Sequence, residues 1–99
     1  MNDVIRHIIV RGLVQGVGYR AFVEDEVAIR GLKGWVRNRR DGAVEAVFAG
    51  SAEEVEMMIA ACRKGPWSAR VDGIDQREGT RDQLAQRRAG EMFSVLATI

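Results

Sequence analysis

Residues 34–49 read GWVRNRRDGAVEAVFA and contain two strand-like segments, Gly34–Asn38 and Ala43–Ala49, on either side of a tight turn. β-Branched and aromatic residues favour extended backbone in both segments. The Asp41-Gly42 pair between them is a hairpin signal, because glycine adopts a positive φ at little steric cost. The stretch therefore predicts a β-hairpin with antiparallel strands.

The first helix is predicted before this hairpin, over Tyr19–Arg30, which contains neither Pro nor Gly. Its apolar residues share one arc when the sequence is plotted at about 100° per residue, although Glu26 falls on the same arc. These apolar residues are Tyr19, Phe22, Val23 and Ile29. Gly31 is expected to cap the carboxyl end of the helix.

The second helix is predicted after the hairpin, from a capping box to about Arg63. In the sequence Ser51-Ala52-Glu53-Glu54, the Ser hydroxyl and the second Glu carboxylate can satisfy backbone amides at the helix start. The apolar residues that follow repeat at spacings of three and four and predict one buried stripe. They are Val55, Met58, Ile59 and Cys62, and Gly65-Pro66 ends the helix.

Three outer segments complete the pattern. Ile5–Val14 predicts a central strand, Val71–Gln76 a weak strand and Met92–Thr98 a better one, whereas Gly79–Glu91 is polar and is interpreted as loop. The order strand, helix, strand, strand, helix, strand is typical of a ferredoxin-like α/β sandwich. We therefore predict an α+β fold, with two helices on one face of a four- or five-stranded, mostly antiparallel sheet and an extra C-terminal edge strand. A length of 99 residues predicts a single domain over residues 1–99.

Composition argues against several classes of protein. Lys and Arg total 15 against 14 for Asp and Glu, so no long-range field attracts nucleic acid or an anionic membrane. No apolar run approaches the roughly 20 residues of a membrane helix, and no signal peptide is recognised. Cys62 is the single cysteine, which fits a reducing compartment and a place in the core. We expect a cytoplasmic protein that binds neither nucleic acid nor membrane.

A glycine-containing turn, Gln15-Gly16-Val17-Gly18-Tyr19-Arg20, lies between the first strand and the first helix. Glycines let successive backbone amides converge, and a helix N-terminus adds partial positive charge, so the turn predicts an anion site in which Arg20 offers a planar fork to phosphate oxygens. The plainer alternative is a tight turn with a solvated arginine. The Walker phosphate-loop pattern is absent. A dinucleotide fingerprint fits the glycines, but no acidic residue follows to hold a ribose.

Asn38 ends the first hairpin strand, and in a split βαβ fold it can face the glycine turn. The plainer alternative is that its side chain bonds its own backbone and begins the turn, which is a common role for Asn. Arg37, Arg39 and Arg40 make the turn basic and could draw in an anionic substrate, although a solvated hairpin explains them as well. Local sequence alone leaves these alternatives open.

Together, the segments VQGVGYR (residues 14–20) and GWVRN (residues 34–38) closely resemble the two signature segments of the acylphosphatase family, and their spacing matches. The resemblance runs from about Ile8 to Ala69 and frays beyond Arg70. It implies a ferredoxin-like enzyme that hydrolyses carboxyl-phosphate anhydrides without metal or organic cofactor. By motif match, the catalytic pair is Arg20 and Asn38.

The residue types suggest how such a site works. Phosphoryl transfer needs positioning and charge stabilisation, which the loop residues Gln15, Gly16, Val17, Gly18, Tyr19 and Arg20 are expected to supply. A neutral amide cannot act as a base near neutral pH, so Asn38 is expected to orient the attacking water. The base is then the substrate phosphate, the partner is a small acyl phosphate, and the enzyme is expected to be a monomer that uses no metal.

Two rival functions are compared with this one. One rival is an RNA-binding module, but the chain lacks the aromatic motif expected of one. The other rival is a free-standing relative of acylphosphatase-like domains in larger maturation enzymes that handle carbamoyl phosphate.

His7 has no second His or carboxylate nearby in sequence and is expected to be packed or on the surface. Trp35 and Trp67 are expected to pack.

Overall fold

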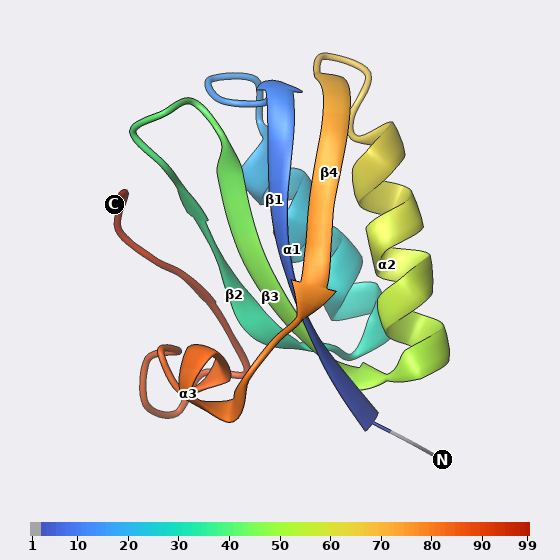
Figure 1. Ribbon diagram of the computed structural model, residues 1–99, viewed down its shortest axis with the longest axis vertical. Helices are drawn as coiled ribbons and strands as arrows, with labels where there is room; N and C mark the ends of the chain where they lie inside the picture. The colour runs from blue at the N-terminus through green and yellow to red at the C-terminus, as the bar shows by residue number, and fades with distance from the viewer. Residues whose placement is uncertain (1–2) are drawn as a thin grey trace.

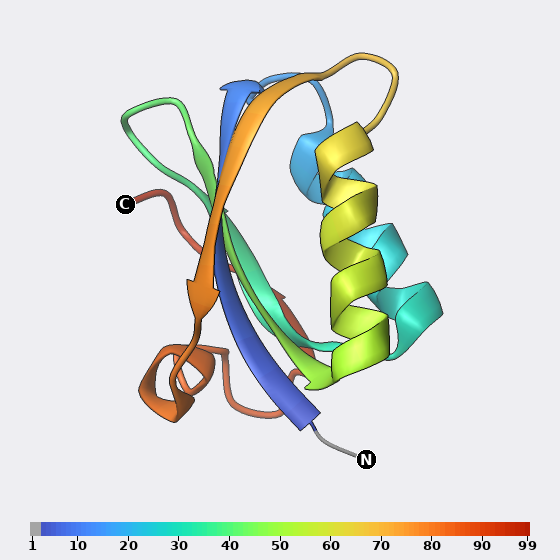
Figure 2. The ribbon, with the colours of Figure 1, turned by 45° about the vertical axis from the view of Figure 1, so that its right-hand side comes forward.

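Two helices pack on one face of a five-stranded sheet in the computed structural model, which describes residues 3–99. Figure 1 shows the arrangement, and Figure 2 shows α1 and α2 on the same side of the sheet. The elements are β1 (Asp3–Leu13), α1 (Tyr19–Arg30), β2 (Lys33–Asn38), β3 (Val44–Ser51), α2 (Ala52–Lys64), β4 (Arg70–Glu78), α3 (Arg81–Leu84) and β5 (Phe93–Val95).

The strand order β4-β1-β3-β2-β5 confirms the predicted ferredoxin-like fold. β1 pairs antiparallel with β3 and β4, and β2 pairs antiparallel with β3, while β5 is the extra edge strand and runs parallel to β2. β5 is shorter than the predicted Met92–Thr98. The chain nevertheless continues beside β2, because the amides of Leu96 and Ile99 donate to the Val36 and Asn38 carbonyls at 2.9 and 3.2 Å.

The core lies between the sheet and the two long helices. The predicted stripe of α2 is confirmed, since Val55, Met58, Ile59 and Cys62 are all buried. In α1 the buried residues are Tyr19, Val23 and Val27. The prediction that Ile29 joins them is wrong, since Ile29 is 76% exposed. Residues four positions apart share a helix face, so the buried face that includes Tyr19 continues through Val23 to Val27 and leaves Ile29 outside it.

The structure confirms the predicted C-cap of α1 and one half of the capping box predicted at the start of α2. Gly31 caps α1 with φ 66°. Ser51 Oγ accepts the Glu54 amide at 3.2 Å, which is one half of the predicted capping box. The Glu54 carboxylate, which was to supply the other half, lies 3.7 Å from Arg30 Nη1, so it contacts α1.

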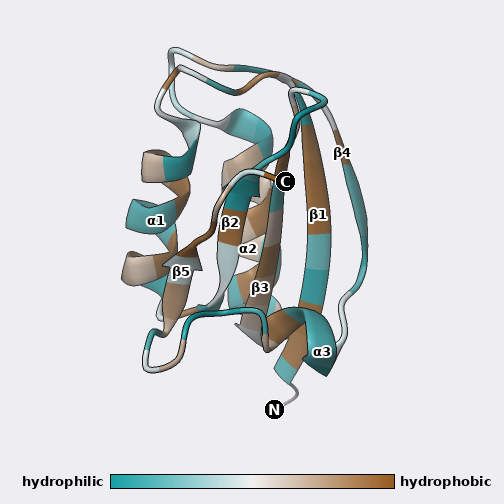
Figure 3. Ribbon diagram, turned by 90° about the vertical axis from the view of Figure 1, so that its left-hand side faces the viewer, coloured by the Kyte–Doolittle hydropathy of each residue, from teal (hydrophilic) through white to brown (hydrophobic). Residues whose placement is uncertain are grey.

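The polar segment 79–91 is not entirely loop, which corrects the prediction. Thr80 and Gln83 form a reciprocal capping box that starts the short helix α3. α3 lies on the face of the sheet away from α1 and α2 (Figure 2), and Trp35 Nε1 donates to the Gln83 carbonyl at 2.7 Å. Figure 3 shows mainly polar residues on the segment between α3 and β5, and β1 as hydrophobic stretches separated by a hydrophilic one. Within residues 3–99, no helix has the length and apolarity that a membrane crossing requires.

Candidate active site

The two segments singled out in the sequence meet at one end of the sheet. Figure 1 shows the turn after β1 and the β2–β3 hairpin turn at the same end. The Gln15 side chain joins them, because Nε2 donates to the Arg39 carbonyl at 2.7 Å and to the Ala43 carbonyl at 2.8 Å. The turn of residues 15–20, here called the phosphate loop, is therefore fixed against both sides of the hairpin turn that follows Asn38.

The backbone of the phosphate loop depends on two glycines. Gly16 and Gly18 have φ of 74° and 82°, in the left-handed region where side chains are strained. Gly18 is the N-cap of α1 and has no side chain to accept the first amides; the first helical bond runs from the Phe22 amide to the Gly18 carbonyl. The remaining amides of the first turn are therefore available to an anion, and the helix dipole favours one there.

Arg20 lies in this first turn and has no ion-pair or hydrogen-bond partner for its side chain among residues 3–99. It is half-buried. Two of the three hairpin arginines are different: Arg37 Nε donates to Glu45 at 2.8 Å, and Arg39 Nη2 donates to Asp41 at 3.0 Å. The third, Arg40, is exposed, and its side chain has no ion-pair partner among residues 3–99. The charges of Arg37 and Arg39 are largely neutralised locally, whereas the Arg20 guanidinium is left to bind something else.

Asn38 is placed on the same face of the sheet as α1. Alternation along β2 puts Val36 and Asn38 on the helix-covered face and Trp35 and Arg37 on the other. The turn itself is closed by Asp41, whose Oδ1 accepts the Ala43 amide at 3.0 Å. Within the described part of the chain the Asn38 side chain makes no hydrogen bond, so the reading of Asn38 as a turn-closing residue has no support.

The side chains of two predicted loop residues are bonded to other parts of the protein. Gln15 uses its amide nitrogen on the hairpin, and the Tyr19 hydroxyl donates to the Cys62 carbonyl at 2.7 Å. Tyr19 is 1% exposed, and burial raises the pKa of its hydroxyl far above the usual value. Both side chains hold the loop in place, which leaves their amides as the groups that could face a phosphate.

Cys62 is a core residue, as the sequence predicts. Its side chain is fully buried in α2, and burial raises the pKa of the thiol to about 12. A thiol in that state carries almost no thiolate near neutral pH. Cys62 therefore cannot serve as a nucleophile for phosphoryl transfer.

A third segment contacts the phosphate loop, and no local sequence pattern predicts this contact. The Ser68 hydroxyl donates to the Val17 carbonyl at 2.7 Å, although 51 residues separate the two. Ser68 belongs to the α2–β4 connection, which lies on the opposite side of the loop from the hairpin because β4 and β3 flank β1. The neighbouring Trp67 is 98% exposed, so the expectation that it packs is wrong, whereas Trp35 is buried as predicted.

The other face of the sheet carries a paired cluster that sequence reasoning missed. Glu45 lies 2.6 Å from His7 Nε2 and accepts Arg37 Nε at 2.8 Å, and the Arg37 guanidinium stands 4.6 Å from the centre of the Trp35 ring. Burial acts to raise the pKa of Glu45, but the hydrogen bonds from His7 and Arg37 outweigh it, so this pKa lies below its ordinary value. His7 therefore has a carboxylate partner, although Glu45 lies 38 residues away from it in the sequence.

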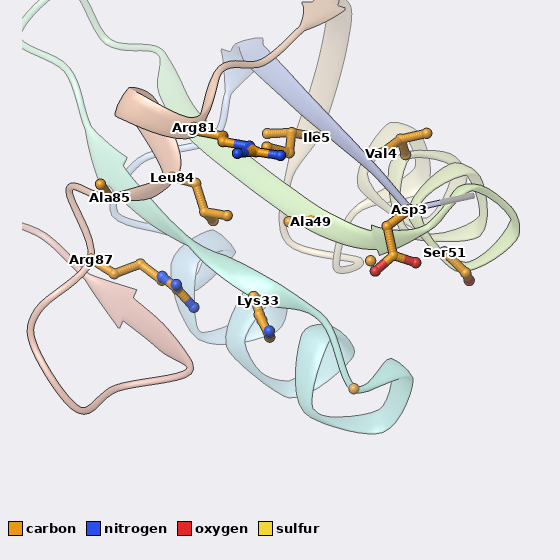
Figure 4. Close-up of a pocket in the computed structure, with 12 residues that line it drawn as sticks. Asp3, Val4, Ile5, Lys33, Ala49, Ser51, Arg81, Leu84, Ala85 and Arg87 are labelled. Atoms are coloured by element: carbon orange, nitrogen blue, oxygen red, sulfur yellow. The ribbon is translucent and has the colours of Figure 1, made fainter. Parts of the chain in front are cut away.

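A pocket of about 720 Å³ lies at the opposite end of the sheet from the phosphate loop (Figure 4). Its charged lining residues are Asp3, Lys33, Arg81 and Arg87. None of the residues of the phosphate loop lines it, and Asn38 does not either. The volume of a pocket therefore does not identify the site that the sequence predicts for phosphoryl transfer. Among residues 3–99 no group of three or more His, Cys, Asp or Glu side chains is arranged to hold a metal ion.

Comparison with known proteins identifies the family of this chain. The family model described as Acylphosphatase matches residues 6–89. A protein of Rhodopseudomonas palustris (strain BisB18) named acylphosphatase is 57% identical over 99 residues, which is 100% of both chains. The crystal structure of acylphosphatase from Bacillus subtilis has a TM-score of 0.81 and 34% identity, covering 94% of this chain and 98% of that one. Full-length HypF, solved in a phosphate- and nucleotide-bound form, also gives a TM-score of 0.81, with 26% identity over 98% of this chain and 12% of its own.

Proposed function

Because the chain belongs to the acylphosphatase family, we infer that it is an enzyme that hydrolyses acyl phosphates, and we propose that the phosphate loop and Asn38 form its active site. The observation that carries this proposal is the pair of hydrogen bonds from the Gln15 side chain to the hairpin, at 2.7 and 2.8 Å. They support the proposal because they hold the phosphate loop against the hairpin that carries Asn38.

The substrate phosphoryl group binds in the phosphate loop. Its peripheral oxygens accept from loop amides and from the Arg20 guanidinium, which is supported by the absence of any competing acidic partner for Arg20 within residues 3–99. Charge on these oxygens persists through a loose transition state, so donors fixed in advance stabilise it without reorganising. The N-terminus of α1 adds its partial positive charge at the same point.

The reaction is a direct displacement by water. The water oxygen forms a new bond to phosphorus while the bond from phosphorus to the bridging oxygen breaks, and the electron pair of that bond leaves with the carboxylate. One proton of the water remains on the attacking oxygen, and the other passes to a peripheral phosphoryl oxygen. The products are a carboxylate and dihydrogen phosphate, and together they carry the charge of the dianionic substrate.

Asn38 orients the attacking water in this scheme. An amide oxygen can accept from the water and an amide nitrogen can donate to it, but neither group can remove its proton near neutral pH. Holding the water in line with the breaking bond lowers the barrier by reducing the entropy lost on reaching the transition state. The role is supported by the position of Asn38 at the end of β2, before the turn that Gln15 holds, and by the lack of a hydrogen-bond partner for its side chain within residues 3–99.

The chemistry of the site favours acyl phosphates over phosphate monoesters. A carboxylate is a good leaving group, so the reaction needs neither a covalent nucleophile nor a strong base. The candidate nucleophile Cys62 is buried with a raised pKa, and His7 is engaged with Glu45 on the far face of the sheet. A monoester would require protonation of its leaving alkoxide, for which the described residues around the loop offer no acid.

A nucleic-acid module is the less favoured function. Ferredoxin-like modules that bind RNA stack bases on aromatic side chains of the open sheet face. Here Trp35 occupies that face, but it is 1% exposed and its indole donates to the Gln83 carbonyl. We further propose one domain over residues 1–99 that works as a cytoplasmic monomer on small acyl phosphates.

The direct test is hydrolysis of benzoyl phosphate by the purified protein in the presence of a metal chelator. The proposal expects turnover that continues without metal and competitive inhibition by inorganic phosphate, because the phosphate product resembles the bound group. Lack of turnover, or activity that disappears with the chelator and returns with Mg²⁺, would refute this account of the site.

A further inference from the structure

The α2–β4 connection contacts the phosphate loop and presents an exposed aromatic side chain. Trp67 is 98% exposed, while the other tryptophan of the chain is buried. Trp67 stands at the second position of a tight turn closed by the Ala69 amide and the Pro66 carbonyl at 3.0 Å. A large apolar surface is thus held in solvent by an ordered turn.

This turn is attached to the phosphate loop itself. The hydroxyl of Ser68, the next residue after Trp67, donates to the Val17 carbonyl at 2.7 Å. The β4 strand that follows begins at Arg70, opposite Leu13 in register, two residues before the start of the phosphate loop. Trp67 is therefore tethered through one residue to the segment proposed to hold the phosphoryl group.

The position of Asn38 sets the direction in which the leaving group departs. In an in-line displacement, the attacking water and the leaving oxygen lie on opposite sides of phosphorus. Asn38 is on the hairpin side of the phosphate loop, and the α2–β4 connection is on the other side, as the strand order and Figure 1 agree. Water delivered from the hairpin side therefore directs the acyl group toward the side of Trp67.

From this geometry we propose that Trp67 contacts the acyl group of the substrate and gives the enzyme a preference for acyl phosphates with aromatic or extended apolar acyl groups. The inference rests on the proposed function of the phosphate loop and Asn38. An indole face offers a large apolar surface and favours offset or edge contacts with an aromatic ring. A methyl group, as in acetyl phosphate, is too small to use most of that surface.

The test compares two substrates and four proteins. The kcat/KM values for benzoyl phosphate and acetyl phosphate are measured for the wild type, Trp67→Ala, Trp67→Phe and the control Ile29→Ala, which removes another exposed apolar side chain from α1. An aromatic contact of this kind corresponds to a roughly 2- to 12-fold effect. We expect Trp67→Ala to lower the ratio of benzoyl to acetyl phosphate kcat/KM by about fivefold. Trp67→Phe should retain most of the ratio, and Ile29→Ala all of it.

A binding measurement provides a second readout that does not need turnover. Benzoylphosphonate, a non-hydrolysable analogue of benzoyl phosphate, should change the fluorescence of the wild type. It should not change that of Trp67→Phe, in which only the buried Trp35 remains. Acetylphosphonate should give a smaller change in the wild type.

The outcomes separate this inference from the function on which it rests. An unchanged substrate ratio in Trp67→Ala, with both substrates still hydrolysed, would overturn the role of Trp67 and leave the proposed function standing. Equal losses on both substrates would also overturn it, because they would indicate a general effect on the loop. A wild type that hydrolyses neither substrate would instead overturn the proposed function.

Discussion

Arg20, in the first turn of α1, and Arg37, on the face of the sheet away from the helices, differ in what surrounds them. Arg37 is paired with Glu45 at 2.8 Å and lies over the Trp35 ring, whereas Arg20 has no acidic partner within the described chain and sits beside the free amides of a helix start. A paired, stacked guanidinium contributes to the stability of the fold. A guanidinium held without a partner contributes little to stability, and it stays available for a charged ligand.

The largest expected effect is the loss of activity in Arg20→Ala. Removing well-aimed donors that stabilise transition-state charge typically costs about 10²- to 10³-fold in rate, and we expect kcat/KM for benzoyl phosphate to fall by this amount. Arg20→Lys should restore little, because an ammonium lacks the planar fork. The matched control is Arg63→Ala, which removes an exposed arginine of α2 and should leave kcat/KM unchanged.

The thermal stability of Arg20→Ala also tests the contrast between Arg20 and Arg37. Because Arg20 has no ion-pair partner in residues 3–99, Arg20→Ala should change the thermal midpoint by no more than about 2–4 °C, as for surface substitutions that shift stability by roughly half a kcal/mol. A calorimetric scan measures this midpoint. A large drop in the midpoint would show that Arg20 supports the fold, and the contrast with Arg37 would then fail.

Glu45→Ala is expected to lower the stability of the protein and to leave its activity nearly unchanged. This change leaves His7 and Arg37 without the carboxylate that joins them, and losing hydrogen bonds to a charged group typically costs about 1.5–3 kcal/mol of stability. Urea unfolding should show this loss. The kcat/KM for benzoyl phosphate should stay within about twofold below the unfolding transition, because the cluster faces away from the phosphate loop; a loss approaching that of Arg20→Ala would contradict this assignment.

The smallest expected effect is the acid dependence of stability. The pKa of Glu45 in the folded protein lies below its ordinary value of 4.5, so the unfolded chain binds a proton here more readily than the folded one. The contribution is complete above about pH 5 and is lost as the pH falls from 4.5 through the lowered folded pKa. Urea unfolding between pH 3 and 6 should show a shallower acid loss for Glu45→Gln than for the wild type, and equal slopes would remove Glu45 from this account.

Short-range signals in the sequence predicted the parts of the site that lie within one turn of chain. Glycines at positions needing positive φ, followed by an arginine at a helix start, specify the phosphate loop, and Asp41-Gly42 specifies the hairpin that carries Asn38. The polar composition of residues 79–91 predicts a loop and does not reveal the capping box of Thr80 and Gln83 that starts α3.

Contacts between distant segments could not be predicted in the same way. Glu45 meets His7 only because β1 and β3 pair in one register, and a shift by one residue would turn the side chain to the other face. The bond from Ser68 to the Val17 carbonyl joins residues from two connections that become neighbours only when β4 is placed beside β1. No local pattern marks either contact.

The central claim, that Arg20 holds the phosphoryl group while Asn38 positions water, is tested most directly by measuring kcat and the inhibition constant for inorganic phosphate in Arg20→Ala and Asn38→Ala, with Arg63→Ala as the control. Arg20→Ala should weaken both phosphate binding and turnover, since its contacts exist in the bound substrate and in the transition state. Asn38→Ala should lower kcat by about 10²-fold or more, an effect on the scale of losing one fixed donor, while phosphate inhibits as strongly as in the wild type. If Asn38→Ala instead weakened phosphate inhibition as much as Arg20→Ala and preserved kcat, Asn38 would be a phosphate-binding residue and the claim would be contradicted.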